Sequence, residues 1–495
     1  MKKVLIIGAG IAGLTCGIYT KMNGFDVQIY EMHNVPGGEC TGWDRGDYHF
    51  DGCIHWLVGS RPDTDLHKLW KTTGALHEDT QIINHEAFGV YEEDGRSVSV
   101  YTHADKLQKH LLEISPQDAK EIRRLCNAIK ALGSFGMPIE KPMDMMTVGD
   151  GIKFAARNLG SLGKLSRYRK MSMAQFASRF KNPLLQKAFL SAIPGDYTST
   201  ALVFTLAGMH RGDSGYPIGG SRAFAKRMEQ RFIELGGEIY YKHRAEKVII
   251  MDGRAVGLRM ADGKEVFGNF VISCADGYAT LYRILENKHT PDVYKKLFAD
   301  PKKYQLPTSA IVFMGIGCEI ETPHRSITIK RESSVNVSGV DTDTAMLLSY
   351  AYDNTMAPRG KTVMAGFYEA DYDYWSALYK DKEQYKQAKE RLRQDAIAVL
   401  LRRFPQAEGK IETTDVVTPL TYERYCNAWR GAWMSWGSGS KDIPQYHPGE
   451  LPGLENFIMA GMWTLPPGGL PGAAAAGRFA AHRLCIREGV AFRKE

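Results

Sequence analysis

The hydrophobic pattern of the chain opens with a βαβ unit. Residues 4–7 (Val-Leu-Ile-Ile) form a short apolar run rich in β-branched side chains, which predicts a buried parallel strand. A helix is expected from residue 14 to about residue 22, and the pair Asn23-Gly24 ends it. Residues 26–30 predict a second strand. This order of elements is typical of a parallel α/β sheet.

The turn between the first strand and the helix contains three glycines, Gly8, Gly10 and Gly13. Gly8 permits a tight turn, Gly10 lets backbone N–H groups approach a pyrophosphate, and Gly13 lets the helix pack closely on the strand. The phosphates would lie at the helix N-terminus, where the N–H groups and the helix dipole favour an anion. Glu31 follows the second strand, at the position where a carboxylate binds ribose hydroxyls. A βαβ unit without a nucleotide is the alternative.

A similar arrangement occurs near the other end of the chain. Residues 456–461 predict a strand, and the run Pro-Pro-Gly-Gly-Leu-Pro-Gly at 466–472 leads into a helix over residues 473–484. Small residues there would let the ring edges and ribityl hydroxyls of a flavin approach the backbone. The two glycine turns therefore predict two helix N-termini that meet at one bound cofactor.

The segment 205–299 is predicted to return to the same sheet. A helix is expected over 222–235, and four strands follow at 239–241, 245–250, 255–260 and 270–275. Asp-Gly pairs at 252–253 and 262–263 are signals for hairpin turns. Two long stretches, about 70–204 and 300–450, belong to neither phosphate-binding unit, and the second contains a helix expected at 380–404.

Length and composition narrow the class of protein. A chain of 495 residues is too long for one core, so two domains are expected. With 44% hydrophobic and 24% charged residues it has the composition of a folded soluble protein, and no apolar run reaches the roughly 18 residues that cross a bilayer. Its eight cysteines lie far apart without a Cys-x-x-Cys motif, which argues against a metal site and against a disulfide framework. A cytoplasmic location is expected.

The net charge of +7 is unevenly distributed. Residues 151–195 contain nine Lys or Arg and no Asp or Glu, interleaved with apolar positions. Such a basic amphipathic stretch is typical of a peripheral contact with a membrane surface, and a solvated helical face is the alternative. No recognition motif accompanies the charge, so nucleic-acid binding is not expected.

The residues after the βαβ unit distinguish between nucleotide cofactors. The chain has Asn-Val-Pro-Gly-Gly-Glu at 34–39 and then a segment over 43–52 that ends in Phe-Asp-Gly. Here it resembles the superfamily of flavin-dependent amine oxidases and phytoene desaturases, in which this second glycine turn lies beside the flavin and its phosphates. The family usually has an arginine close behind these glycines, whereas this chain has Glu39, and Arg45 is the candidate substitute.

The C-terminal turn indicates the branch. It resembles the phytoene desaturase, carotenoid isomerase and retinol saturase branch, whereas amine oxidases tend to have an acid after the strand glycine, where this chain has Met462-Trp463. The resemblance also places Val248 at the adenine end of FAD. The residues expected to bind FAD are Gly8, Gly10, Ile11, Ala12, Gly13, Glu31, Gly37, Gly38, Arg45, Val248, Gly461, Gly469, Leu470, Pro471, Gly472 and Ala473.

Four further residues are candidates for substrate chemistry. His55 and Trp56 follow the Phe-Asp-Gly segment, and His55 could transfer a proton near neutral pH, with a structural histidine as the alternative. Tyr422 and Trp433 belong to an aromatic-rich segment that could wall a pocket for an apolar ligand, with ordinary core packing as the alternative.

These observations predict an α/β flavoprotein. A Rossmann-like FAD-binding domain is expected from residues 1–69, 205–299 and 451–495, and a discontinuous α+β substrate domain from 70–204 and 300–450. The resemblance implies hydride transfer to or from flavin N5, which desaturates or saturates a carbon–carbon bond of an isoprenoid, polyene or other lipid. A non-redox double-bond isomerase, an amine oxidase and a non-enzymatic escort of prenylated proteins are the alternatives. The absence of a second intact dinucleotide fingerprint leaves the electron donor or acceptor open.

Overall fold

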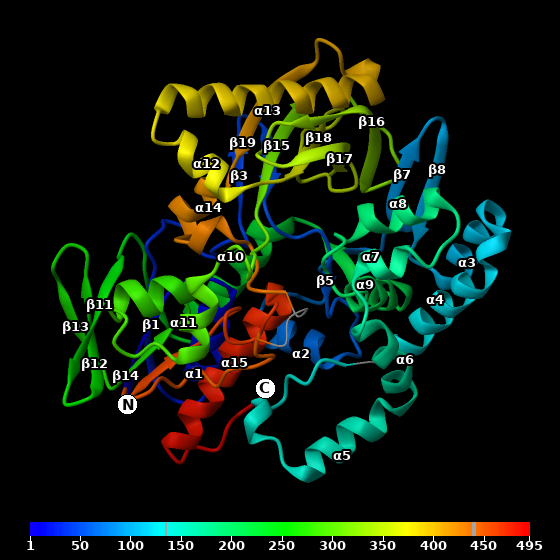
Figure 1. The fold of residues 1–495 in the computed structure, drawn as a ribbon. Helices are drawn as coiled ribbons and strands as arrows, with labels where there is room; N and C mark the ends of the chain where they lie inside the picture. The colour runs from blue at the N-terminus through cyan, green and yellow to red at the C-terminus, as the bar shows by residue number, and fades with distance from the viewer. Residues whose placement is uncertain (134–135, 438–441) are drawn as a thin grey trace.

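Five parallel strands form a sheet to which both ends of the chain contribute. In the computed structural model, which describes residues 1–133, 136–437 and 442–495, their order is β10-β2-β1-β14-β20 (Figure 1). Ile272 of β14 lies between Ile6 of β1 and Ile458 of β20. The strands span Glu238–Tyr240 (β10), Asp26–Tyr30 (β2), Lys3–Ile7 (β1), Phe270–Ser273 (β14) and Phe457–Met459 (β20). The Rossmann-like sheet predicted from the sequence is confirmed.

The two faces of this sheet are covered differently, because successive side chains of a strand point to opposite faces. Val4 and Ile6 pack with three helices, α1 (Ile11–Met22), α10 (Gly220–Glu234) and α15 (Gly469–Arg487). Leu5 and Ile7 pack instead with a small antiparallel sheet and with α11. That sheet and helix span Ala245–Met251 (β11), Arg254–Met260 (β12), Glu265–Phe267 (β13) and Asp292–Ala299 (α11).

The first hairpin turn forms as its sequence predicts. Asp252 and Gly253 both have positive φ angles, 49° and 75°, and they connect β11 with the antiparallel β12. Positive φ at both central residues is the signature of a type I′ turn, whose twist matches that of the flanking strands.

A second sheet of seven strands forms the other half of the molecule. Its order is β19-β15-β18-β17-β16-β7-β8, and only the β16–β7 pair is parallel. The strands span Ile411–Val417 (β19), Ser309–Ile316 (β15), Thr362–Glu369 (β18), Asp341–Ser349 (β17), Ser326–Asn336 (β16), Ala87–Glu93 (β7) and Arg96–Tyr101 (β8).

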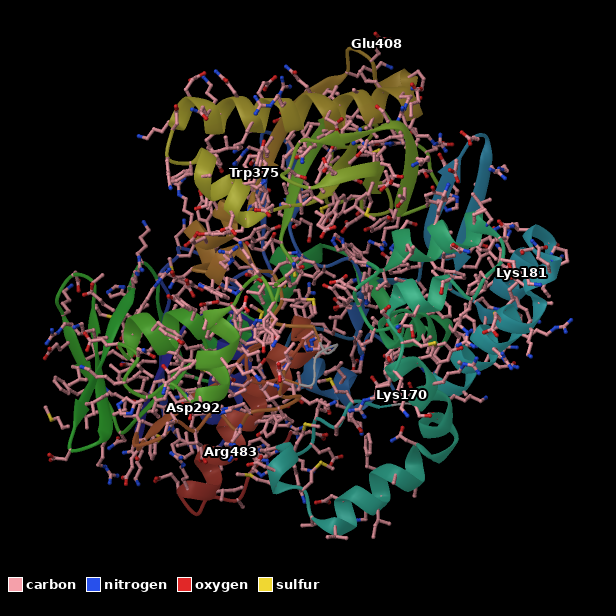
Figure 2. All side chains as sticks on the ribbon, viewed as in Figure 1. Lys170, Lys181, Asp292, Trp375, Glu408 and Arg483 are labelled. Carbon is pink, nitrogen blue, oxygen red and sulfur yellow. The ribbon has the colours of Figure 1, made fainter. Side chains whose placement is uncertain are left out.

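The long helix α13 (Lys382–Arg403) lies across the outer face of this sheet (Figure 1). Val312 and Met314 of β15 pack under this helix, together with the fully buried Trp375 of α12 (Tyr372–Leu378) (Figure 2). Ile311 and Phe313, which point the other way, pack toward the first sheet. The space between the two sheets is therefore bordered by the inner face of β15.

Helices between residues 104 and 210 form a third cluster, which lies beside β7 and β8 except for the helix at residues 148–157, which lies farther away (Figure 1). They span Ala104–Ile114 (α3), Ala119–Leu132 (α4), Val148–Arg157 (α5), Leu159–Arg169 (α6), Met173–Ala177 (α7), Pro183–Ala192 (α8) and Thr200–His210 (α9). The domain boundary expected at residue 204 falls inside α9, which packs against α4. The basic stretch 151–195 is divided among α5, α6, α7 and α8.

Shorter elements connect these parts. They are Gly42–Arg45 (β3), Tyr48–Asp51 (β4), Leu57–Val58 (β5), Ile82–Ile83 (β6), Ser214–Pro217 (β9), Asp65–Thr72 (α2), Pro419–Cys426 (α14), a π-helical turn at Ala279–Ile284 and 3₁₀ turns at Pro116–Asp118, Met143–Met145, Pro405–Ala407 and Trp429–Gly431. None of the helices in the described residues has the length and apolar character needed to cross a membrane.

Candidate functional site

A cavity of about 1090 Å³ lies where the parallel strands end. Ile7, Glu31, Ala275 and Gly461 border it at the carboxyl ends of β1, β2, β14 and β20, and Phe313 borders it from the second sheet. Ligands of open α/β sheets bind at this edge. The volume slightly exceeds the roughly 300–1,000 Å³ of ordinary small-molecule pockets, so the cavity has room for a large cofactor and part of a substrate.

The first glycine turn has the geometry that its spacing predicts. Gly8 has a φ of +94°, and its N–H donates to the carbonyl oxygen of Tyr30 at 2.8 Å. A Cβ at Gly13 would lie 1.9 Å from the carbonyl oxygen of Gly8, so only glycine fits at that position. Gly10 is different, because a Cβ there would meet only the carbonyl oxygen of Gly37, at 3.9 Å. Gly10 therefore borders open space that a nucleotide can fill.

Glu31 is fixed at the edge of the cavity. One carboxylate oxygen accepts a hydrogen bond from the N–H of Ala9 and the other from the N–H of His33, both at 2.7 Å. The side chain is buried and still borders the cavity. A carboxylate offers about four acceptor positions, so two remain for the hydroxyls of a ribose.

The second and third glycine turns face the same space. Gly37 and Gly38 have φ angles of +107° and +61°, and the N–H of Gly37 donates to the carbonyl oxygen of Ala9 at 2.8 Å. Gly469 has a φ of +68° and begins α15, four residues earlier than the sequence pattern predicts. Ile11 at the start of α1 and Gly469 at the start of α15 border one cavity. Two helix N-termini thus point to the place where an anionic cofactor would bind.

Most residues expected to bind FAD border this cavity, and four do not. Gly13, Val248, Pro471 and Gly472 lie outside its lining, where Gly13 packs against Gly8 and Val248 lies in the core of the antiparallel sheet. The same segment contacts the cavity through Arg244 and Ala245 instead. The expected residues that do border the cavity are Gly8, Gly10, Ile11, Ala12, Glu31, Gly37, Gly38, Arg45, Gly461, Gly469, Leu470 and Ala473.

Arg45 is not free to neutralise a phosphate. It borders the cavity, but its guanidinium lies 2.5 Å from the carboxylate of Asp415 on β19. Arg244 also borders the cavity, and in the part of the chain that the structure describes it has no ion-pair partner. Arg244 is therefore the better candidate for a cofactor phosphate, although no motif in the sequence marks it.

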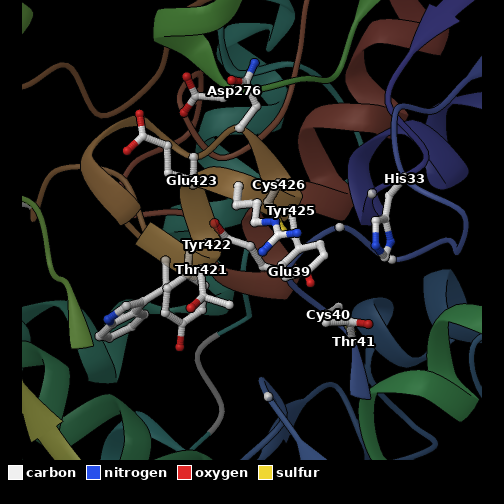
Figure 3. A pocket seen from close by; sticks show the side chains of 18 of the residues that line it. His33, Glu39, Cys40, Thr41, Asp276, Thr421, Tyr422, Glu423, Tyr425 and Cys426 are labelled. Carbon is white, nitrogen blue, oxygen red and sulfur yellow. The ribbon is translucent and has the colours of Figure 1, made fainter. Parts of the chain in front are cut away.

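Glu39 and Asp276 are two acids that border the cavity (Figure 3). Burial, together with the negative charge of Asp276, raises the pKa of Glu39 to about 8. Burial also raises the pKa of Asp276 to about 6, although Asp276 accepts hydrogen bonds from the N–H groups of Ala279 at 2.8 Å and Trp429 at 3.1 Å. Glu39 is thus mostly protonated at neutral pH. A neutral carboxyl group does not repel phosphates, which explains how an acid can follow the Gly37-Gly38 turn.

His55 and Trp56 do not border the cavity, in contrast to Tyr422 and Trp433, which do. Burial and the nearby Arg325 lower the pKa of His55 to about 3. The imidazole is therefore neutral near pH 7, and its role in proton transfer stays a prediction. Trp56 packs on Phe88, with 5.4 Å between ring centroids.

The wall opposite the glycine turns is aromatic. Phe313 of β15 and Trp43 of β3 pack edge to face, with 5.3 Å between centroids, and both border the cavity. Tyr422 of α14 contributes its ring, and its hydroxyl lies 3.4 Å from that of Ser309 (Figure 3). This wall suits an apolar or planar group placed over a cofactor.

Comparison with known proteins agrees with this geometry. The family model described as flavin containing amine oxidoreductase matches residues 11–485. The chain is 21% identical to a chloroplastic prolycopene isomerase from Daucus carota, over 98% of this chain and 80% of that protein. It is 24% identical to a lycopene-forming phytoene desaturase from Pseudescherichia vulneris, over 97% of this chain and 98% of that protein.

Solved structures share the fold. An oxidoreductase from Methanosarcina mazei superposes with a TM-score of 0.60 at 15% identity, over 98% of this chain and all of that chain. A triple mutant of putrescine oxidase superposes with a TM-score of 0.63 at 15% identity, over 98% of this chain and 99% of that chain. At this identity the likeness concerns the fold alone. The family match shows an FAD-dependent protein, and the glycine turns, the two helix N-termini and Glu31 make this cavity the candidate FAD site.

Proposed function

The chain belongs to the flavin containing amine oxidoreductase family and is an FAD-dependent oxidoreductase, and from this premise we propose that it desaturates or saturates carbon–carbon bonds of an apolar polyene, isoprenoid or other lipid. The observation that carries the proposal is the aromatic wall of Trp43, Phe313 and Tyr422, which borders the same cavity as the glycine turns. Relatives along almost the whole chain that are named as carotenoid desaturases support the same substrate class.

The residues of the chain position the substrate and keep water out. Bound FAD supplies the acceptor or donor of a hydride. The glycine turns and Glu31 hold the nucleotide, and the aromatic side chains exclude water from the reacting carbons. Chemistry of this kind needs orientation and a dry pocket more than it needs a catalytic dyad.

A non-redox double-bond isomerase is the second candidate, because the relatives include prolycopene isomerases matched over 98% of this chain. Amine oxidation receives less support. Met462 stands where amine oxidases tend to have an acid, and putrescine oxidase shares only the fold.

We also propose that the protein is cytoplasmic and contacts a membrane surface through residues 151–195. All eight cysteines are free thiols, which fits a reducing compartment. Helix α5 lies at the edge of the molecule, away from both sheets (Figure 1), and Lys170 and Lys181 extend from the same helical cluster (Figure 2). An apolar substrate partitions into membranes, so a surface contact would bring the enzyme to it.

The test is anaerobic mixing of the FAD-loaded protein with phytoene in detergent while flavin absorbance is followed. Bleaching of oxidised flavin, with a product that has one more double bond, supports desaturation. Reoxidation of pre-reduced flavin by a conjugated polyene supports saturation. A change of double-bond geometry without net flavin turnover would instead identify an isomerase. Hydrogen peroxide formed from putrescine in air, with no reaction of any polyene, would overturn the proposal.

A further inference from the structure

Arg325 is a buried cation without a counter-ion. Arg325 directly precedes β16 in the sequence, and it is only 5% exposed. Among the described residues its side chain makes one hydrogen bond, a long one of 3.4 Å from an Nη atom to the carbonyl oxygen of Phe88, and Nε has no partner. Across residues 1–133, 136–437 and 442–495, no carboxylate lies within ion-pair distance of it. Leaving a charge in this state is costly unless something else binds it.

The carboxylates of this region are occupied elsewhere. Asp51 accepts from both the N–H and the hydroxyl of Ser221. Asp353 accepts from the hydroxyl of Tyr216 at 3.0 Å and from the N–H of Gly219 at 2.9 Å. Neither can turn to Arg325 without losing these buried hydrogen bonds.

Other unused polar groups surround the guanidinium. Nε2 of His85 is buried without a partner. The ring of His85 packs edge to face on that of Tyr352, with 4.5 Å between centroids. Within the described part of the chain, neither the hydroxyl of Tyr352 nor the ring of His55 makes a hydrogen bond. These groups come from separate segments of the chain, and among the described residues the long bond from Arg325 to Phe88 is the one hydrogen bond that any of them donates from its side chain.

The neighbouring imidazoles add no positive charge. Burial and the charge of Arg325 lower the pKa of both His55 and His85 to about 3, so each is neutral at pH 7. Burial also lowers the pKa of Arg325, but a guanidinium starts so high that it keeps its proton. Among Arg325, His55 and His85, Arg325 therefore contributes the single positive charge, which one carboxylate of a ligand can balance.

Apolar surfaces flank the cation. The guanidinium carbon lies 5.7 Å from the ring centroids of both Trp56 and Phe88. Trp56, His85 and Tyr352 are each half-buried, which leaves part of their surfaces for a ligand. The cluster is also near the FAD cavity, because His55 follows two residues after Cys53, which borders that cavity.

We propose that Arg325, His85 and Tyr352 bind the carboxylate of an otherwise apolar ligand, and that the substrate is a long-chain polyene or isoprenoid acid rather than a pure hydrocarbon. The guanidinium binds the carboxylate through two N–H groups, and the imidazole N–H and the phenol donate to its oxygens. The assignment rests on the proposed function for the identity of the substrate, while the binding itself is independent of turnover.

The test measures binding of three probes to the FAD-loaded protein by calorimetry: retinoic acid, its methyl ester and acetate. The acid is expected to bind at least tenfold more tightly than the ester, and acetate only weakly. Arg325→Met should remove the preference for the acid, Arg325→Lys should keep part of it, and Tyr352→Phe should reduce it.

Equal affinity of wild type for acid and ester, or an unchanged preference in Arg325→Met, would overturn the assignment. Acetate that binds as tightly as retinoic acid would show a small-anion site and would also overturn it.

A measurement of thermal stability tests whether Arg325 has only a structural role. Replacing an unpaired buried cation by methionine should leave the melting temperature unchanged or raise it. A lower melting temperature in Arg325→Met, without loss of acid binding, would mean that Arg325 supports the fold. If retinoic acid binds through Arg325 while no polyene changes the flavin spectrum, the proposed function fails and the carboxylate site stands. If a polyene turns over but Arg325→Met binds the acid normally, the proposed function stands and the carboxylate site fails.

Discussion

Gly13 of α1 faces the carbonyl oxygen of Gly8, and a Cβ built at Gly13 would lie 1.9 Å from that oxygen. At Gly10, three positions earlier in the turn, the nearest atom to an added Cβ is 3.9 Å away. One glycine of the fingerprint thus serves the packing of the fold, while the other keeps space for the cofactor.

Gly10→Val is therefore expected to fold but to lose FAD. The backbone of Gly10 has φ −68° and ψ 177°, which valine adopts without strain. We expect FAD affinity to fall at least about 100-fold, or ~2.7 kcal/mol, because the side chain occupies the space of the pyrophosphate. Flavin fluorescence after gel filtration measures retention, and circular dichroism measures folding.

Gly13→Val is the matched control and should fail in a different way. Its side chain collides with backbone, so the free energy of unfolding should fall by ~3 kcal/mol or more. Normal FAD retention in Gly10→Val, or normal stability in Gly13→Val, would contradict the division of roles between these glycines.

Glu39 should make cofactor binding sensitive to alkaline pH. Its pKa in the folded protein is about 8, above the ordinary value of 4.5. A raised acid pKa means that the unfolded chain releases the proton first, so stability falls as pH rises from about 4.5 to 8 and is level above that range. Ionised Glu39 also repels the phosphates, so FAD affinity should weaken above pH 8.

Glu39→Gln imitates the protonated acid and should flatten both pH profiles. Calorimetric titration of the apoprotein with FAD between pH 6 and 9.5 compares the two proteins. Asp276→Asn is a second variant, which should lower the pKa of Glu39 because the charge of Asp276 helps to raise it. An FAD affinity of wild type that stays constant up to pH 9.5 would argue against a neutral Glu39 at the phosphates.

The two histidines near Arg325 should destabilise the protein in acid. Both have pKa values of about 3 in the folded state, below the ordinary 6.5. The unfolded chain takes up these protons first, so stability is complete above about pH 6.5 and is lost as pH falls toward 3. In His55→Gln and His85→Gln the loss of melting temperature between pH 7 and 5 should be smaller than in wild type. The rate of flavin reduction in His55→Gln should keep the pH dependence of wild type near neutrality.

Arg244 should matter more for FAD than Arg45 does. Both border the cavity, but Arg45 is paired with Asp415 while Arg244 has no ion-pair partner among the described residues. We expect Arg244→Met to weaken FAD binding several-fold more than Arg45→Met, and the difference to shrink at high salt because salt screens exposed charges. Titration with FAD at 50 mM and 500 mM salt provides the comparison. The opposite order of effects would restore Arg45 as the phosphate partner.

Local patterns in the sequence are sufficient to predict the nucleotide-binding half, and long-range contacts determine the rest. Spacing alone indicates the turn at Gly8 and the hairpin at Asp252-Gly253. The family resemblance places Val248 at the cofactor, whereas Ala245 of the same strand borders the cavity, and alternation along β11 does not distinguish the two. The pairing of Arg45 with Asp415 joins residues 370 positions apart, and no pattern within one segment reports it.

The last prediction concerns the basic helical stretch. Val148 and Ile152 of α5 are 83% and 64% exposed, which is unusual for large apolar side chains, and the stretch 151–195 contains no acid. A membrane surface would bury such side chains while its anionic lipids attract the Lys and Arg residues.

Wild type should sediment with vesicles in which about a third of the lipid is phosphatidylserine, and it should sediment less at high salt. Val148→Asp/Ile152→Asp should remain in the supernatant. Ile233→Asp on α10 is the control, because Ile233 is 49% exposed but belongs to a helix that packs on the first sheet and not to α5. Equal sedimentation of all three proteins would contradict a membrane contact through α5.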